Sequence, residues 1–389
     1  MAETLHPEQF VQHQVEETIT TSVSNLYFTE DHVYKTWLHH HGLIDDLEFF
    51  PVRVGYLEGE ERKGKIINYG YVQQVYEGIV ALKYDRDEGG DVVGFEEIEL
   101  NALNPRLQAK ELEDWDFALK MKRFPKERRM DKMLKAGTLK PQHIADAVHR
   151  IIDQYDRFSR LEEDYAQALA TDIDNIIADT FSFDYMQNVL GVILDRDKVG
   201  LIEVGTRTFL TEHKPDLQRA LQDGSIKYSH GDTKILNIYV GDGEVGDKDK
   251  CYILDAISFK DEWCLNDLLS DLAYFAIYFD VEKYLDFPQN LEVIDEAYKQ
   301  RTGSDLGLQE NPMFWFYLNY RAMVQAKVAA IEAVNAETEG KDALDKQDEA
   351  EELMSLGAFY LAKALSGLPE KIDLVVKLMS IRIDYLAKK

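Results

Sequence analysis

The sequence predicts an α+β fold with two lobes, a small β-rich N-terminal lobe at residues 1–124 and a larger, mostly helical C-terminal lobe at 125–389. Three observations predict it. The chain has 389 residues, of which 45% are hydrophobic, and this is enough for two hydrophobic cores. Apolar residues alternate as in strands from about residue 20 to residue 123. After that point they recur with a helical period.

Strand signals fill the N-terminal lobe. Residues 25–28 and 32–38 alternate on either side of an acidic turn, which predicts a hairpin. Further strands are expected at 75–84 and 115–122, with a polar insertion between them. Residues 53–69 are charged and helix-like, although three glycines weaken that prediction. Together these elements outline a small lobe built on a sheet.

Helical periodicity dominates the C-terminal lobe. Pro141 suits the first turn of a helix with one apolar face, and helical patterns continue through 161–190 to Leu217. Short strand signals interrupt these helices at 225–228, 235–240 and 251–255. Helices are expected again at 266–283, 289–302, 311–337, 345–366 and 369–387.

The charge balance excludes some partners. With 72 acidic and 44 basic side chains the net charge is −28, which repels nucleic-acid phosphates and anionic membrane surfaces. We therefore expect no nucleic-acid partner. The acidic surface favours either solubility in salt or attraction of cationic substrates and metal-loaded nucleotides, and both interpretations stay open.

Other features of the sequence bear on its location. Two cysteines, Cys251 and Cys264, cannot build a disulfide framework or a cysteine zinc site, which is typical of a reducing compartment. The first residues lack the basic and apolar regions of a signal peptide, and no apolar run approaches the ~20 residues that span a bilayer. The sequence thus predicts a cytoplasmic protein with no membrane partner.

The segment from His230 to Asn237 carries the strongest functional motif. It follows the catalytic-loop pattern of kinase-like phosphotransferases, in which an Asp accepts the proton of the attacking hydroxyl and an Asn five residues later holds Mg²⁺. Asp232 and Asn237 have that spacing. Strands 235–240 and 251–255 read as a hairpin, at whose end Asp255 can face Asn237 across the metal. The alternative is an ordinary turn between strand and loop, where Gly and Asp are common.

Together these segments resemble the aminoglycoside phosphotransferase-like kinases, and most closely a bacterial branch often fused to a P-loop ATP-binding domain. The resemblance is carried by Ser229-His230-Gly231-Asp232 with Asn237, by Ile253-Leu254-Asp255 through Phe259, and by Asp261, Asp267 and Asp271-Leu272-Ala273, with weaker matches at 33–35, 75–80, 120–123, 320–322 and 326–328. It implies a protein-kinase-like fold whose N-terminal lobe binds nucleotide. It also implies ATP and Mg²⁺ as cofactors and transfer of the γ-phosphate to a hydroxyl of a small molecule.

The resemblance also implies roles for two residues of the nucleotide lobe, a lysine and a glutamate. Lys35 would pair with ATP phosphates, and an acidic residue on the following helix would orient it. Glu60 is the residue chosen for this role, with Glu61 as its close alternative. A solvated lysine at a strand end and a solvated run of charges are the competing interpretations for Lys35 and Glu60.

Chemistry gives the remaining residues their roles. Asp232 would act as the base, and Asn237 and Asp255 would bind Mg²⁺ through oxygen. Lys234 stands where the bacterial branch usually has His, and it could contact the γ-phosphate. Alternatively it pairs with a nearby carboxylate and only supports the loop.

Several positions depart from the family pattern. Cys264, Ser258 and Gln325 stand where Arg, Glu and Arg are usual, and Tyr155 replaces a frequent His, so the acceptor side is altered. The stretch before Lys35 has no Gly-rich loop, so Thr and Ser residues at 18–24 would have to serve the phosphates with backbone amides. The fused P-loop domain is absent, because Gly241 to Gly246 is followed by Asp247-Lys248 rather than by Lys-Ser/Thr.

Three weaker signals have simpler explanations. Adjacent residues on a strand point to opposite faces, so His39-His40-His41 is not expected to chelate one ion. Residues 85–96 nearly fit a calcium loop, but an acidic hairpin turn is favoured. The aromatic run at 314–317, with Tyr320, is expected in the core rather than on a substrate.

The first functional prediction is an ATP- and Mg²⁺-dependent phosphotransferase acting on a small polar molecule. A catalytically weak nucleotide-binding regulatory or interaction module is the second, and a kinase acting on protein hydroxyls the third. The identity of the acceptor and the oligomeric state stay open.

Overall fold

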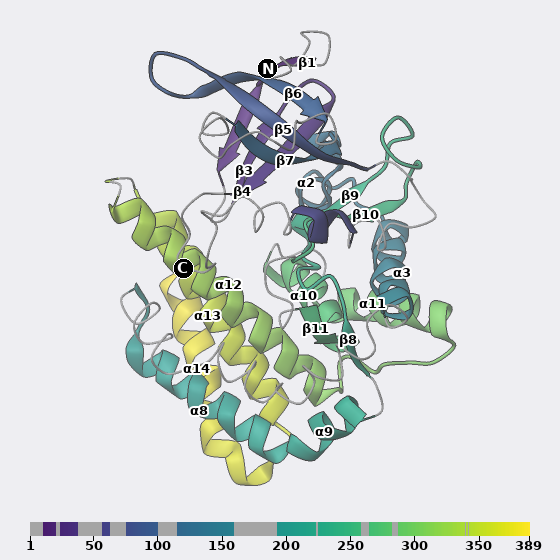
Figure 1. Cartoon of the computed structure of the whole chain (residues 1–389). Coiled ribbons are helices and arrows are strands. Elements are labelled where there is room, and N and C mark those ends of the chain that lie inside the picture. Colours follow the sequence, from purple (N-terminus) through teal and green to yellow (C-terminus); the bar gives the residue numbers. More distant parts are fainter. Residues whose placement is uncertain are drawn as a thin grey trace. The chain divides into compact units, whose positions relative to one another are not determined.

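The computed structural model describes residues 11–20, 24–37, 57–62, 75–99, 115–158, 193–222, 225–257, 264–281, 287–338, 340 and 342–389. The chain divides into two compact units (Figure 1). Unit 1 comprises Met1–Arg129 and Tyr239–Lys260, and unit 2 comprises Met130–Ile238 and Asp261–Lys389. The α+β class predicted from the sequence, β-rich at the N-terminus and helical at the C-terminus, is confirmed.

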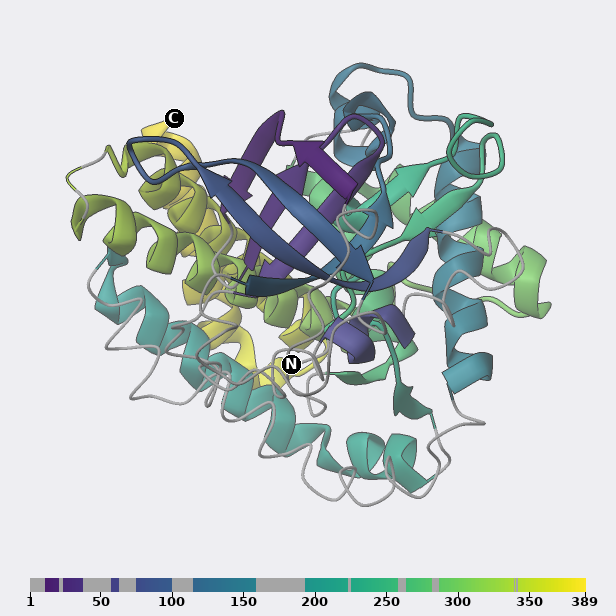
Figure 2. The same ribbon diagram turned by 45° about the horizontal axis from the view of Figure 1, so that its top comes forward.

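Unit 1 is built on an antiparallel seven-stranded sheet with the order β1-β6-β5-β7-β4-β3-β2, whose strands are seen crossing the unit in Figure 2. The strands are β1 (Val11–Gln14), β2 (Glu17–Thr20), β3 (Ser24–Phe28), β4 (His32–Trp37), β5 (Tyr76–Arg86), β6 (Val92–Glu99) and β7 (Trp115–Lys122). Tyr27, Tyr34, Val80, Leu82, Phe95 and Ala118 form one buried core cluster of the sheet.

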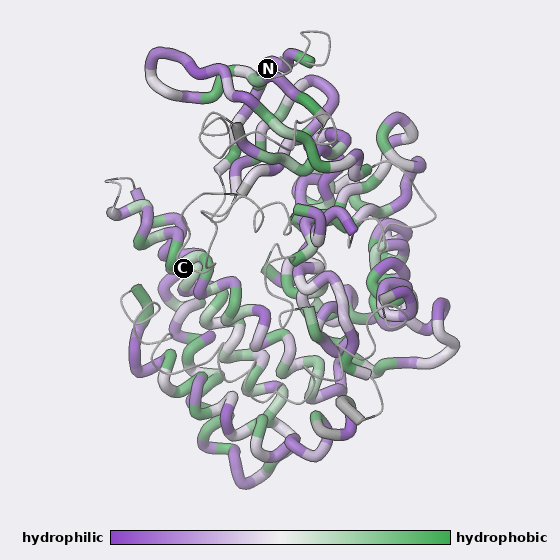
Figure 3. The backbone as a smooth tube through the Cα atoms, in the orientation of Figure 1, coloured by the Kyte–Doolittle hydropathy of each residue, from purple (hydrophilic) through white to green (hydrophobic). Residues whose placement is uncertain are grey.

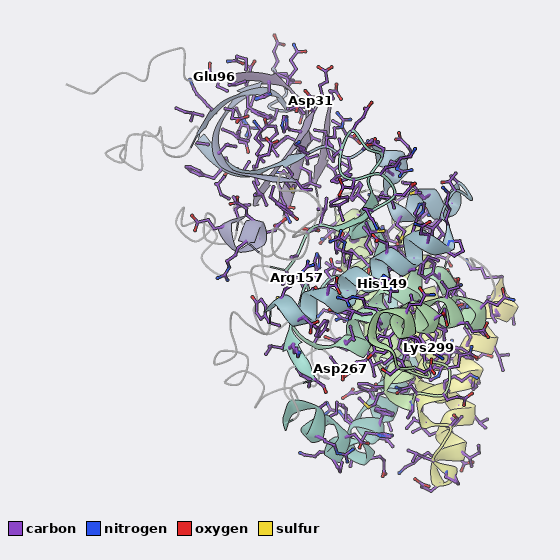
Figure 4. The ribbon with its side chains drawn as sticks, turned by 90° about the vertical axis from the view of Figure 1, so that its right-hand side faces the viewer. Asp31, Glu96, His149, Arg157, Asp267 and Lys299 are labelled. Atoms are coloured by element: carbon purple, nitrogen blue, oxygen red, sulfur yellow. The ribbon has the colours of Figure 1, made fainter. Side chains whose placement is uncertain are left out.

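The four strands predicted for this sheet are present as β3, β4, β5 and β7, whereas β1, β2 and β6 were not predicted. The β3–β4 hairpin has the expected place, with Asp31 in its turn, and Glu96 lies on β6, separated from β4 by β5 and β7 (Figure 4). The supposed polar insertion contains β6, which pairs with β5. Between them the carboxylate of Asp87 accepts hydrogen bonds from the amides of Gly89 and Asp91, at 2.9 and 3.0 Å. Residues 85–96 therefore form the acidic hairpin turn that the sequence favoured.

Unit 1 also contains the hairpin of β9 (Ile238–Val240) and β10 (Cys251–Ile253). Arg128 donates to the carbonyls of Val240 and Gly241, at 2.9 and 2.6 Å, and Phe124 packs against the rings of Tyr239 and Tyr252. These contacts explain why unit 1 extends to Arg129 and takes up this hairpin. The boundary at 124/125 remains a proposal for the limits of the nucleotide lobe.

The expected strand at 235–240 is shorter than predicted. Residues Ile235–Asn237 form a 3₁₀ turn, η7, and the strand β9 begins only at Ile238. The amide of Asn237 donates to the carbonyl of Lys234, which closes the turn. Ile235 in the turn and Ile238 in the strand are both buried, so the pattern of apolar residues does not separate turn from strand.

Unit 2 is mostly helical. Its helices within the described ranges are α2 (Met130–Lys135), α3 (Pro141–Phe158), α8 (Arg196–Glu212), α9 (Lys214–Gln222), α10 (Leu268–Val281), α11 (Phe287–Thr302), α12 (Pro312–Thr338), α13 (Leu344–Leu365) and α14 (Ile372–Lys388), with a 3₁₀ turn at Pro369–Lys371. A two-stranded sheet joins β8 (Ile226–Tyr228) and β11 (Leu265–Asp267). The predicted helix at 161–190 and the histidines at 39–41 lie outside the described residues.

The longest helices form the core of unit 2. Hydrophobic residues recur along α12 and α13 in Figure 3, and the α12 residues Ala326, Ala330 and Ala333 are fully buried. Small side chains let these packed helices approach closely. The aromatic run at 314–317 is buried as well, which confirms it as core. No helix among the described residues is long and apolar enough to cross a membrane.

Helix α3 packs on α11 in the same unit. The ring Nε2 of His149, labelled in Figure 4 with Lys299 of α11, lies 2.9 Å from the carbonyl oxygen of Ala297. Pro141 begins α3 as predicted, because its missing N–H falls where a helix has no partner for it.

Candidate active site

Lys35 lies on β4 in a buried ion pair. Its Nζ is 2.8 Å from Oε2 of Glu60 and also bonds Oδ1 of Asp255. Glu60 belongs to the helical residues 57–62 and is 1% exposed. Burial alone would lower the pKa of Lys35, but the carboxylates of Asp255 and Glu60 outweigh it and raise the pKa. The structure thus brings together the three residues that the sequence singled out in unit 1.

Asp255 has an unusual backbone. Its φ is 65°, in the left-handed region that non-glycine residues rarely adopt. The amide of Asp255 donates to the hydroxyl of buried Tyr76 at 3.3 Å, and about half of the Asp255 side chain is exposed. Such backbone strain persists where neighbouring contacts fix it, and it is often found at functional positions.

The segment from His230 to Asn237 in unit 2 is shaped by its own side chains and by Gln154 of α3. Gly231 has a φ of 82°, which favours glycine. The amide of His230 donates to Oε1 of Gln154 at 3.0 Å, and the amide of Asp232 donates to Nδ1 of His230 at 3.2 Å. The side-chain amide of Asn237 donates to the carbonyl and to Oδ2 of Asp232, both at 2.9 Å. The spacing of Asp232 and Asn237 therefore closes a small loop.

The two oxygens of the Asp232 carboxylate differ in their surroundings. Oδ2 is 2.9 Å from Nζ of Lys234 and also accepts from Asn237. Oδ1 is buried and has no hydrogen-bond partner within the described part of the chain. Burial tends to lower the pKa of Lys234, but Asp232 together with Tyr274 and Tyr278 raises it well above its ordinary value. Lys234 is therefore a stable cation beside Asp232.

A buried polar network contacts the segment from His230 to Asn237. Its centre is Asp271 on α10, whose carbonyl accepts from Oγ1 of Thr233 at 2.8 Å and whose carboxylate accepts from the hydroxyl of Tyr155 at 3.0 Å. Arg321 on α12 lies 3.6 Å from that carboxylate and donates to the carbonyl of Gly231 at 3.3 Å. Burial raises the pKa of Asp271, and Arg321 opposes this shift.

The sequence did not assign roles to this network. In the sequence, Asp271 and Arg321 only match a family pattern, and Tyr155 only departs from it. The structure shows that these three side chains meet beneath the loop. Partners this far apart in the chain cannot be paired by local spacing.

The other positions that depart from the family pattern lie in different parts of the structure. Cys264 is buried, and its carbonyl accepts from the amide of Ser229 at 2.7 Å. Gln325 bonds two tyrosines of α10. Thr18 and Thr20 lie exposed on β2, whereas residues 21–23 and Ser258 lie outside the described residues.

When the chain is compared with known proteins, the matches are found among solved structures. No family model matches the sequence, and no curated protein matches it. A choline/ethanolamine kinase family protein from Mesorhizobium loti is 12% identical with a TM-score of 0.43, covering 94% of this chain and 92% of that one. A protein provisionally described as an aminoglycoside phosphotransferase, from Ralstonia eutropha, is 13% identical with a TM-score of 0.41, covering 93% of this chain and 94% of that one. Over nearly its full length the chain is thus similar to solved structures with these two descriptions.

Proposed function

We propose that the protein is an ATP- and Mg²⁺-dependent phosphotransferase that moves the γ-phosphate to a hydroxyl of a small polar molecule. One observation carries the proposal: Lys234 and Asn237 hold Oδ2 of Asp232, while its buried Oδ1 has no partner within the described residues. An unpaired buried carboxylate oxygen costs stability, so a bound hydroxyl that donates to it is a favourable occupant.

The proposed reaction is an in-line displacement. The acceptor oxygen forms a bond to the γ-phosphorus, the bond from that phosphorus to the bridging oxygen breaks, and ADP leaves with the electron pair. Oδ1 of Asp232 receives the hydroxyl proton. Asn237 and Lys234, through their bonds to Oδ2, fix the direction of the carboxylate during this transfer.

Asn237 and Asp255 each carry an oxygen of the kind that a magnesium ion would need. Both hydrogen bonds that Asn237 makes to Asp232 use its side-chain NH₂, so its amide oxygen keeps its capacity to bind a cation. Asp255 supplies a half-exposed carboxylate, and such oxygen ligands are the kind that Mg²⁺ prefers. When bound, Mg²⁺ would neutralise charge on the phosphates of ATP.

Lys35 would pair with those phosphates. Its pKa is raised, so it carries a positive charge over the whole physiological pH range, and Glu60 fixes its position. We also propose a cytoplasmic location, which agrees with a sequence that has only two cysteines, Cys251 and Cys264.

Two substitutions test the proposal because they should affect ATP binding and turnover differently. Asp232→Ala should lower turnover by ~10²–10⁴ and spare ATP affinity, since it removes only the base. Lys35→Ala should weaken both ATP binding and turnover, since it removes a charge from the phosphates. Calorimetric ATP affinities and ATP consumption would be measured for both variants, with Asp384→Ala and Lys83→Ala as exposed controls. Unchanged turnover in Asp232→Ala would refute the proposal.

One observation favours a second candidate, a nucleotide-binding module with weak or no catalysis. Lys234 forms an ion pair with Asp232, and a carboxylate held in this way can stabilise the loop without taking part in catalysis. Binding of ATP with Mg²⁺ and no detectable ATP consumption, in the wild type and in Lys234→Ala, would favour this module.

A further inference from the structure

Two tyrosines of α10 and a glutamine of α12 form a directed chain of hydrogen bonds in unit 2. The hydroxyl of Tyr278 donates to Oε1 of Gln325 at 2.8 Å, and Nε2 of Gln325 donates to the hydroxyl of Tyr274. Because the Tyr274 oxygen receives a hydrogen bond, its own proton is left for donation. No described residue accepts that proton. We call these three residues the Tyr-Gln-Tyr relay.

The relay ends beside the catalytic loop. Tyr274 lies one helical turn after Asp271, the residue whose carbonyl holds Thr233. The Tyr274 ring centroid is 4.5 Å from the guanidinium carbon of Arg321, which donates to the carbonyl of Gly231. Burial raises the pKa of Tyr274, the charge of Asp232 adds to this, and Lys234 opposes it. The Tyr274 hydroxyl is therefore a neutral donor in the field of the proposed base.

The charged groups near Tyr274 are paired with one another, whereas Glu349 and Asp131 act on Tyr278 at the other end of the relay. Asp232 is neutralised by Lys234 at 2.9 Å, and Asp271 lies 3.6 Å from Arg321. The relay itself consists of two protonated phenols and an amide. At Tyr274, unit 2 therefore offers a hydrogen bond rather than net charge, which suits an uncharged ligand rich in hydroxyls.

We propose that the Tyr-Gln-Tyr relay recognises the acceptor, and that the acceptor is an uncharged polyol with two neighbouring hydroxyls. One hydroxyl donates to Oδ1 of Asp232 and is phosphorylated, and the next accepts the proton that Tyr274 presents. Gln325 and Tyr278 are positioning residues that act through Tyr274. This assignment rests on the proposed function and names the substrate class of the same site.

The test uses the full-length protein with defined probes. Glycerol, ribitol and myo-inositol are uncharged polyols, choline is a cation with one hydroxyl, and kanamycin is a polycation. Each is assayed for phosphate transfer from ATP with Mg²⁺, and separately for binding without ATP by saturation-transfer NMR and calorimetry. Tyr274→Phe, Gln325→Leu and the double variant are compared with Tyr298→Phe, a control on α11 that also loses one hydroxyl. Melting temperatures verify that each variant is folded.

We expect at least one polyol to bind and to be phosphorylated. Tyr274→Phe should raise its KM at least tenfold, Gln325→Leu should raise it less, and Gln325→Leu should add nothing in the Tyr274→Phe background. Absence of binding by all three polyols overturns the assignment, as does binding of choline or kanamycin alone or unchanged polyol affinity in Tyr274→Phe. Polyol binding that depends on Tyr274 without any ATP consumption would keep the recognition site and refute the phosphotransferase.

Discussion

Lys234 is the residue whose contact most constrains the candidate chemistry. It lies two positions after Asp232 and shares Oδ2 of that carboxylate with Asn237. The pairing of Lys234 with a nearby carboxylate, which the sequence analysis gave as the alternative to a contact with the γ-phosphate, is therefore present. A role toward the phosphate stays a proposal, since an ammonium that holds Asp232 in place could also neutralise charge on a leaving γ-phosphoryl group.

Lys234→His tests that role. Imidazole is mostly neutral at pH 7, so the substitution should lower turnover about tenfold, or ~1.4 kcal/mol of transition-state stabilisation. ATP consumption per folded molecule and melting temperature would be measured together. A lower melting temperature with unchanged turnover would leave Lys234 with a supporting role only.

At the scale of elements, a polar cluster ties four strands of unit 1 together. Glu97 on β6 accepts from Tyr34 of β4 at 2.5 Å and from Lys120 of β7 at 2.9 Å, and it lies 2.8 Å from Nε2 of His13 on β1. Burial would raise the pKa of Glu97, but the hydrogen bonds from Tyr34 and Lys120 outweigh it and lower the pKa. Burial lowers the pKa of His13, against the pull of Glu97.

Glu97→Gln should destabilise the protein in a pH-dependent way. A carboxyl with a lowered folded pKa contributes stability above its unfolded value of 4.5, and that contribution is lost as pH falls through the folded pKa. The cost should thus be about 1–3 kcal/mol at neutral pH and should shrink in acid. The free energies of unfolding of wild type and variant, measured by denaturant titration at neutral pH and again in acid, give the comparison. A cost that stays constant with pH would contradict the assignment of charge to Glu97.

The predictable elements were those with a local signal. The β3–β4 hairpin, β7 and α3 follow from alternation, helical period and Pro141, and the pair of Lys35 with Glu60 followed from a family pattern. Strand β6 was missed because its residues 94–97 mix Gly, Phe and two Glu, and cross-strand bonds rather than apolar alternation hold them.

The candidate site was predictable only in part. The spacing of Asp232 and Asn237 is a local property, and their hydrogen bond is present. The Tyr-Gln-Tyr relay joins α10 to α12 across 47 and 51 residues, and the network of Asp271 joins residues still further apart. Such contacts depend on which helix faces pack together, and no periodicity in the sequence specifies that pairing.

At the scale of the whole molecule, the chain passes between its units at 129/130, 238/239 and 260/261. Residues 239–260, which bring Asp255 to Lys35, therefore fold with the sheet although the sequence around them belongs to unit 2. Asn237 and Asp255 fall on different sides of this division, and their joint hold on a metal stays a prediction.

Ligand-induced stabilisation tests the metal in the intact chain. The chain carries a net charge of −28, so ATP without a cation should bind poorly. ATP with Mg²⁺ at a hundred times its Kd should stabilise the fold by ~2.7 kcal/mol. Thermal shifts with ATP in Mg²⁺ and in EDTA provide the measurement, and ADP serves as a control for the γ-phosphate. Equal shifts in EDTA and Mg²⁺ would rule out Asn237 and Asp255 as metal ligands.

The left-handed backbone of Asp255 has a consequence for how this protein can change by mutation. Only Gly, Asn and Asp adopt such a φ readily, so most replacements at this position penalise folding as well as chemistry. Gly and Asn are each one nucleotide away from an Asp codon, and both keep the backbone conformation while removing the negative charge beside Lys35. Asp255 is thus a point where a single base change can remove the proposed metal ligand and leave a folded protein.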